Sequence, residues 1–121
     1  MKTKEEIMQI IHHSTGTECY HKFSPFSGYP VITDGVKALA DAAGCYWLCD
    51  VIGSWQSKSS KLDANFQVWK LLVNEDKTAV IRGYNNGEAR VVSQKIPYTD
   101  FPLAELKLFL VDDVLMLPSE Y

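Results

Sequence analysis

The segment that decides the fold reads DGVKALADAAGCYWLCDVIGSW, residues 34–55. From Val36 to Trp55 its apolar residues recur at spacings of three and four, which predicts amphipathic helix. Thr33 or Asp34 is expected to cap the start, because Thr and Asp are preferred at helix N-termini. Gly44 interrupts the pattern, and glycine disfavours a helix interior. We therefore expect two abutting helices or one bent helix.

Beyond a polar loop expected at 54–61, the period of the pattern changes to two, which is typical of strands. Strands are expected at 18–23, 66–73, 78–85, 88–96, 106–111 and 114–117, and a short helix at 2–13. Asn74–Lys77, Asn86–Gly87 and Asp112–Asp113 are expected as turns. The prediction is one α+β domain, residues 1–121, with an antiparallel sheet of five or six strands packed on one face by two or three helices.

Composition limits the classes of function. The chain has 121 residues, of which 46% are hydrophobic, and its net charge is -3. That charge has the wrong sign for a nucleic-acid footprint, so a nucleic-acid partner is not expected. No apolar run approaches the roughly 18 residues of a membrane span, and Glu5 and Glu6 interrupt the start where a signal peptide is apolar. We expect a cytoplasmic protein without a membrane segment.

The three cysteines do not suggest a disulfide framework, because their number is odd and two lie in an apolar segment. Cys45 and Cys49 are four residues apart and could in principle share a zinc ion with a histidine, but core packing is favoured at such positions. Cys19 and His21 would lie on one face of a strand, too far apart for a nucleophile and its base. No metal and no catalytic residue are assigned.

Signatures of nucleotide-dependent enzymes and of common hydrolases are missing: the sequence contains neither G-x-G-x-x-G, G-x-x-x-x-G-K-[ST], G-x-S-x-G nor H-E-x-x-H. No cofactor is predicted. The helix start at Thr33, Asp34 and Gly35 could bind a small anion through its N–H groups. Asp41 has Lys37 one helical turn earlier, whereas Asp50 lacks an obvious local partner.

Residues nominated for binding are polar or aromatic and come from the first predicted strand and the helical segment. They are Tyr20, His21, Thr33, Asp34, Lys37, Tyr46, Trp47 and Asp50. Other aromatic residues, including Tyr84, could line a base-stacking or partner surface, although such residues more often build the core.

Three segments carry a resemblance to known proteins: GTECYHKF at 16–23, VITDGVKALADAAGCYWLCDVIGSWQ at 31–56 and LPSEY at 117–121. They resemble a family of small uncharacterised bacterial proteins, often encoded on phages and other mobile elements, with the motifs GTExY, TDGVKxLA, YWL and LPSEY. The family is a domain of unknown function, so the resemblance implies an accessory role in a mobile element and supplies no catalytic residues.

Two functions follow as expectations. The first is a non-enzymatic protein-binding or regulatory module, encoded by a phage or plasmid, that acts on a host protein or a defence system. The alternative is a small metal-independent enzyme or ligand-binding domain with a pocket around Tyr20, His21, Thr33, Asp34, Tyr46 and Asp50. A protein partner is favoured, and a small ligand is the second choice.

Overall fold

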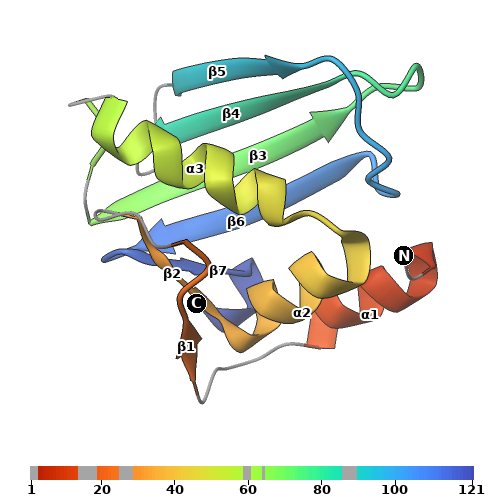
Figure 1. The fold of residues 1–121 in the computed structure, drawn as a ribbon, viewed down its shortest axis with the longest axis horizontal. Helices are drawn as coiled ribbons and strands as arrows, with labels where there is room; N and C mark the ends of the chain where they lie inside the picture. Colours follow the sequence, from red (N-terminus) through yellow and green to blue (C-terminus); the bar gives the residue numbers. More distant parts are fainter. Residues whose placement is uncertain (1–2, 14–18, 25–28, 59–60, 64, 86–89) are drawn as a thin grey trace.

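A computed structural model of the chain describes residues 3–13, 19–24, 29–58, 61–63, 65–85 and 90–121. Within these residues the strands form one sheet in the order β1-β2-β7-β6-β3-β4-β5 (Figure 1). The strands are β1 Tyr20–His21, β2 Val31–Thr33, β3 Phe66–Val73, β4 Ala79–Asn85, β5 Arg90–Ile96, β6 Glu105–Val111 and β7 Val114–Met116. All neighbours pair antiparallel except β2 and β7, which are parallel.

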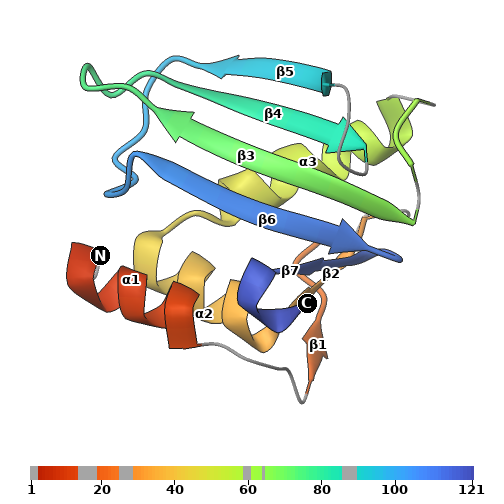
Figure 2. The ribbon, with the colours of Figure 1, turned by 180° about the vertical axis from the view of Figure 1, so that it is seen from behind.

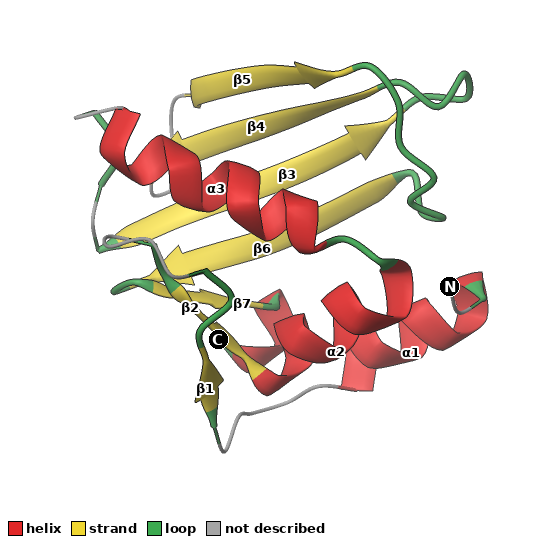
Figure 3. Cartoon of the chain, in the orientation of Figure 1, coloured by secondary structure: helices red, strands yellow, loops and turns green. Residues whose placement is uncertain are grey.

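The helices lie on one side of the long strands and along the lower edge of the sheet (Figure 3). They are α1 Lys4–His13, α2 Asp34–Ala43, α3 Tyr46–Lys58 and a 3-10 turn η1 Pro118–Glu120. Helix α3 crosses one face of β3, β4 and β6, whereas α1 and α2 pack on each other next to β6 and β7. Seen from behind, no described helix covers the opposite face of β3, β4 and β5 (Figure 2).

The predicted α+β class is confirmed, but the description of the sheet was wrong. The described chain has seven strands rather than five or six, and one pair is parallel. The missed strand, β2, has three residues, which is too short for alternation to reveal. The strand expected at 18–23 is shorter in the structure, because β1 holds only Tyr20–His21 and the described residues 19, 22 and 23 lie outside it; residue 18 is not among the described residues.

The helical segment forms two abutting helices, which is one of the two arrangements expected from the sequence. Gly44 is the C-cap of α2 with a φ of 65°, a left-handed conformation that glycine adopts without strain, and its N–H donates to the carbonyl of Ala40. The polar loop expected from residue 54 was wrong, because α3 continues to Lys58. Trp55 Nε1 donates to Gln94 Oε1 at 2.7 Å and Gln56 Nε2 to Gln67 Oε1 at 3.0 Å, so the last turns are tied to the sheet.

The antiparallel meander of β3, β4 and β5 is confirmed, with β3 at the predicted residues 66–73. The turn after β3 includes Lys77 at a φ of 71°. Asp112 and Asp113, at φ of 47° and 65°, form the turn between β6 and β7, since aspartate tolerates the left-handed region. The hairpin expected at Asn86–Gly87 lies outside the described residues.

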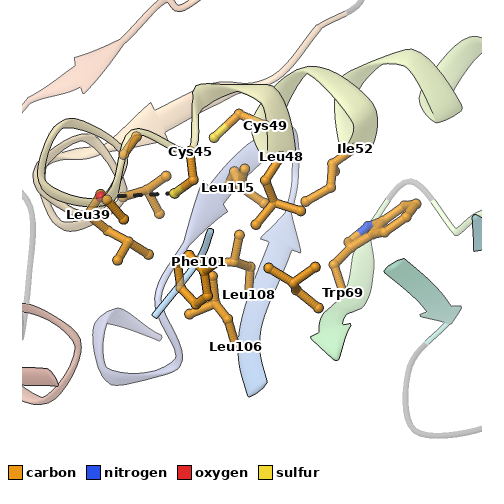
Figure 4. Packing of buried hydrophobic residues seen from close by; sticks show 14 of the residues in the cluster. Leu39, Cys45, Leu48, Cys49, Ile52, Trp69, Phe101, Leu106, Leu108 and Leu115 are labelled. Atoms are coloured by element: carbon orange, nitrogen blue, oxygen red, sulfur yellow. Dashed lines mark hydrogen bonds between the residues drawn. The ribbon is translucent and has the colours of Figure 1, made fainter. Parts of the chain in front are cut away.

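The core lies between α3 and the sheet and continues to α1 and α2 (Figure 4). Trp69 is 1% exposed, and its ring lies so close to Gly83 that a β-carbon there would be 2.8 Å from it. The indole Nε1 donates to Gln67 Oε1 at 2.9 Å, so the buried ring has its hydrogen-bond acceptor. No described helix is long and apolar enough to cross a membrane.

Candidate functional site

Thr33 caps helix α2. Its backbone is extended, and its Oγ1 accepts a hydrogen bond of 3.2 Å from the N–H of Val36. The same hydroxyl donates to Glu120 Oε1 at 2.7 Å, and the residue is 1% exposed. Of the two caps expected from the sequence, Thr33 is the cap and Asp34 is the first helical residue. The Thr33 side chain is therefore buried beneath the start of α2 and is not accessible to a partner.

The carboxylate of Glu120 occupies the start of α2. Oε1 also accepts from the N–H of Leu117 at 3.0 Å, and Oε2 accepts from the N–H of Gly35 at 3.3 Å. A carboxylate is stabilised here because the N–H groups of a helix start carry partial positive charge. The position at which the sequence suggested a small anion is thus held by the chain's own side chain.

Asp34 turns away from the cap and pairs with His21 of β1. His21 Nε2 lies 2.7 Å from Asp34 Oδ1, and it is the donor because an ionised carboxylate only accepts. The backbone N–H of Cys19 donates to Asp34 Oδ2 at 3.4 Å. The side chains of His21 and Asp34 are 30% and 43% exposed, so the pair is accessible to a partner.

A second polar group lies further along α2. Asp41 Oδ2 is 3.0 Å from Lys37 Nζ, as its spacing predicted, and Tyr46 OH donates to Asp41 Oδ1 at 2.6 Å. The hydrogen bond from Tyr46, followed by that from Lys37, lowers the pKa of Asp41 below its ordinary value. Burial, followed by the bond to Asp41, raises the pKa of Tyr46 to about 12.

These two groups form one surface, which we call the α2 surface: Tyr20, His21, Asp34, Lys37, Asp41 and Tyr46. Asp34, Lys37 and Asp41 are spaced three and four residues apart, so they share one side of the helix. Tyr20, which precedes His21 in β1, is 62% exposed.

The remaining nominated residues lie apart from this arrangement. Asp50 is an exposed residue of α3, and Trp47 is half-buried and packs against the core. No hydrogen bond in the described residues joins either of them to the α2 surface.

Cys45 and Cys49 pack in the core, at 3% and 2% exposed, as the sequence predicted. Cys45 Sγ donates to the carbonyl of Leu39 at 3.9 Å (Figure 4). Burial raises the pKa of each thiol to about 12, which suppresses the thiolate that a nucleophile or metal ligand requires. Among the described residues, no group of three or more His, Cys, Asp or Glu side chains is placed to hold a metal ion.

Glu120 is the residue that sequence reasoning missed. It lies 85 positions from Gly35, so no local pattern connects the two. The sequence feature that pointed to Glu120 is its place in LPSEY, which, like TDGVKxLA, is one of the motifs shared with the resembling family. The structure places these two motifs in contact.

Together, the mixed sheet, the broken helix and the half-buried Glu120 carboxylate at the start of α2 define the class as an α+β domain in which a side chain of the same chain occupies the N-terminus of α2. The chain belongs to the DUF6876 family, a family of unknown function, which matches residues 5–121. No curated protein and no solved structure matches the chain.

Proposed function

We propose that this chain is a non-enzymatic protein-binding module and that the α2 surface is its contact region. The observation that carries the proposal is the fixed arrangement of accessible polar groups: His21 holds Asp34, while Lys37 and Tyr46 hold Asp41. Side chains already held in one conformation lose little entropy when a partner binds. Tyr20, the exposed neighbour of His21 in β1, is of the type that supplies much of the energy in protein interfaces.

The charge of the surface indicates the chemistry of the partner. Two aspartates and one lysine lie along α2, with a histidine next to Asp34. A partner with a basic patch would complement this arrangement, and charge complementarity chiefly raises the association rate and the specificity. The resemblance to mobile-element proteins supports a host protein or a defence component in the cytoplasm as the partner.

A second candidate, a small enzyme or ligand-binding domain, rests on the His21–Asp34 pair. A histidine held by a carboxylate is the arrangement of a general base and its orienting group. Asp34→Asn separates the two functions when it is combined with partner capture. A base would lose its orientation and its activity toward a small substrate, whereas a protein interface would show reduced affinity for a captured protein.

The test uses the full chain as bait in a lysate of its native host. Tyr20→Ser/Asp34→Asn changes the α2 surface, and Tyr98→Ser/Asp100→Asn is the matched control, since Tyr98 is 67% exposed and Asp100 is also exposed. A protein that the parent and the control enrich equally, and that the α2 variant loses at least about tenfold, supports the proposal. Equal enrichment by all three baits would remove the α2 surface from the interface.

A further inference from the structure

The face of the sheet opposite α3 has a composition of its own. Along β3 the side chains alternate, so that Trp69 and Leu71 are buried on the α3 side while Lys70 points to the other side. We call this other side the open face, because no described helix covers it over β3, β4 and β5 (Figure 2). Its strand positions hold the basic residues Lys70, Arg82, Arg90, Lys95 and Lys107 and one acidic residue, Glu105.

Three of these basic residues form a row across neighbouring strands. Lys107 of β6 lies directly opposite Lys70 of β3, and Lys70 lies directly opposite Arg82 of β4. Like charges in directly opposed positions destabilise a sheet. In the described part of the chain none of the three forms an ion pair, so the fold does not compensate their repulsion.

An apolar and aromatic row runs beside the basic one. Phe109, Val68 and Tyr84 are directly opposed across β6, β3 and β4. The Lys70 ammonium lies 5.3 Å from the centre of the Tyr84 ring. Phe66 extends the row, with its ring 5.3 Å from that of Phe109, and the exposed ring of Tyr121 packs edge-on against both, at 5.3 Å from Phe66 and 5.6 Å from Phe109. The two rows are therefore neighbours, one able to contact flat apolar groups and the other able to contact anions.

A hollow of about 590 Å³ lies at the β4 and β5 end of the basic row. Arg82, Ser93 and Lys95 contribute to its lining. The Nε of Arg82 is buried and has no hydrogen-bond acceptor among the described residues. A buried donor without an acceptor is unfavourable, and the same side chain is one of those that line the hollow, where its guanidinium charge favours an anion.

We propose that the open face binds single-stranded nucleic acid, with phosphates along Lys107, Lys70 and Arg82 and bases on the rings of Tyr84 and Tyr121, which lie at the two ends of the aromatic row. Single strands are bound in this way, by aromatic rings that stack on bases and basic side chains that follow the backbone. The net charge of -3 argued against such a partner, but it averages over the whole chain. The field that a bound strand meets is that of one face, where the basic residues are concentrated.

The binding test measures fluorescence anisotropy of a labelled oligothymidylate of about 12 nucleotides with the full chain. Lys70→Gln/Arg82→Gln/Lys107→Gln is compared with Lys4→Gln/Lys22→Gln/Lys58→Gln, which removes the same charge from exposed residues elsewhere. The first variant should lose at least about tenfold in affinity and lower the slope of log K against log salt by about two, whereas the control stays within about twofold of the parent. Equal losses by both variants, or no binding by the parent at about 50 mM salt, would overturn the proposal.

Folding and base contact are checked separately. Because the substitutions in the basic row remove repulsion, the triple variant should melt at or above the temperature of the parent, so lost binding would not reflect unfolding. Tyr84→Leu should weaken binding of the oligothymidylate but leave binding of inorganic polyphosphate unchanged, since only the oligothymidylate carries bases. If polyphosphate or polyglutamate competes with the oligothymidylate as well as unlabelled oligothymidylate does, the face recognises charge alone and the proposal of a nucleic acid is wrong.

Discussion

The carboxylate of Glu120 lies where a side chain on Gly35 would be: a β-carbon on Gly35 would be 2.6 Å from Glu120 Oε1. The absence of a side chain at Gly35 is what lets its N–H reach Oε2 at 3.3 Å. Glycine is required here for close approach rather than for an unusual backbone angle. The motifs TDGVKxLA and LPSEY are therefore in contact at Gly35, where the first motif has a residue without a side chain.

Gly35→Ala should lower the free energy of unfolding by about 1 to 2 kcal/mol. The new methyl group displaces the Glu120 carboxylate from its three hydrogen bonds, and this loss exceeds the gain in helix propensity. Urea denaturation measures the change. In a Glu120→Ala background the same substitution should be neutral or stabilising by up to about 1 kcal/mol. An equal loss in both backgrounds would contradict the assignment of the clash.

Thr33→Ala should be more destabilising than Asp34→Ala. The first removes the cap and the buried donor to Glu120, at about 2 kcal/mol in total, whereas the second removes an exposed pair worth less than about 1 kcal/mol. Thr33→Ser keeps the hydroxyl and should retain most of the stability. The order of the thermal melting temperatures checks the prediction, and the reverse order would restore Asp34 as the cap.

Tyr46→Phe should raise the pKa of Asp41, because the Tyr46 hydroxyl is the largest cause of its lowering. Carboxyl-carbon NMR titration measures this directly, and Lys37→Gln should raise the same pKa through the loss of the Lys37 hydrogen bond and charge. A pKa that is lowered in the folded state contributes stability above the unfolded value, and this contribution is lost as the pH falls below about 4. Asp41→Asn should therefore make the free energy of unfolding fall less steeply as the pH is lowered below about 4.

Tyr46 affects the dependence of the free energy of unfolding on pH in the alkaline range. Its pKa is raised to about 12 in the folded state, so its contribution to stability is present below the unfolded value near 10 and is lost as the pH rises toward 12. Phenolate absorbance of the parent minus that of Tyr46→Phe should show a late titration. A difference curve centred near 10 would mean that the Tyr46 hydroxyl is neither buried nor hydrogen-bonded to Asp41 in solution.

The three thiols should differ in reactivity toward a maleimide at pH 8. Cys19 is exposed and should react quickly, whereas Cys45 and Cys49 are buried with pKa values raised to about 12 and should react only after unfolding. Mass spectrometry should count one label per native chain and three per denatured chain, and none on native Cys19→Ser. Rapid labelling of Cys45 in the native protein would show that the core opens.

Dialysis against a strong chelator should leave the circular dichroism spectrum and the melting curve unchanged. Cys45 and Cys49 are held by apolar packing around Leu48, so the expected stability does not depend on a metal ion. Loss of structure together with stoichiometric zinc in the untreated protein would overturn this assignment.

Elements with a regular period were predictable from the sequence. Alternation located β3, β4 and β6 to within a residue or two, and the helical spacing with Gly44 located both α2 and α3. Strand β1 lies within the strand expected at 18–23, whereas β2 was not predicted, since three residues cannot show a period. The parallel pairing of Val31 and Ile32 with β7 depends on contacts between residues more than 80 positions apart in the sequence. Local propensity cannot predict such a pairing.

At the candidate site, the pairs close in sequence were foreseeable and those across the fold were not. The Lys37–Asp41 pair follows from helical spacing, whereas the contacts of His21 with Asp34 and of Glu120 with Thr33 require the tertiary structure. The basic row was hidden for a related reason. Lys70, Arg82 and Lys107 are widely separated in sequence, and only the strand register places them opposite one another.

The parallel pairing of β2 with β7 also affects the order in which the protein can assemble during translation. Residues 31–33 leave the ribosome long before residues 114–116, yet β2 reaches the main sheet through β7. Until then the apolar side of α2, with Leu39 and Ala43, lacks its final partners and resembles the surface that chaperones bind. The meander of β3, β4 and β5 pairs only with nearby sequence, so it can form first and offer a template to which the earlier third of the chain returns.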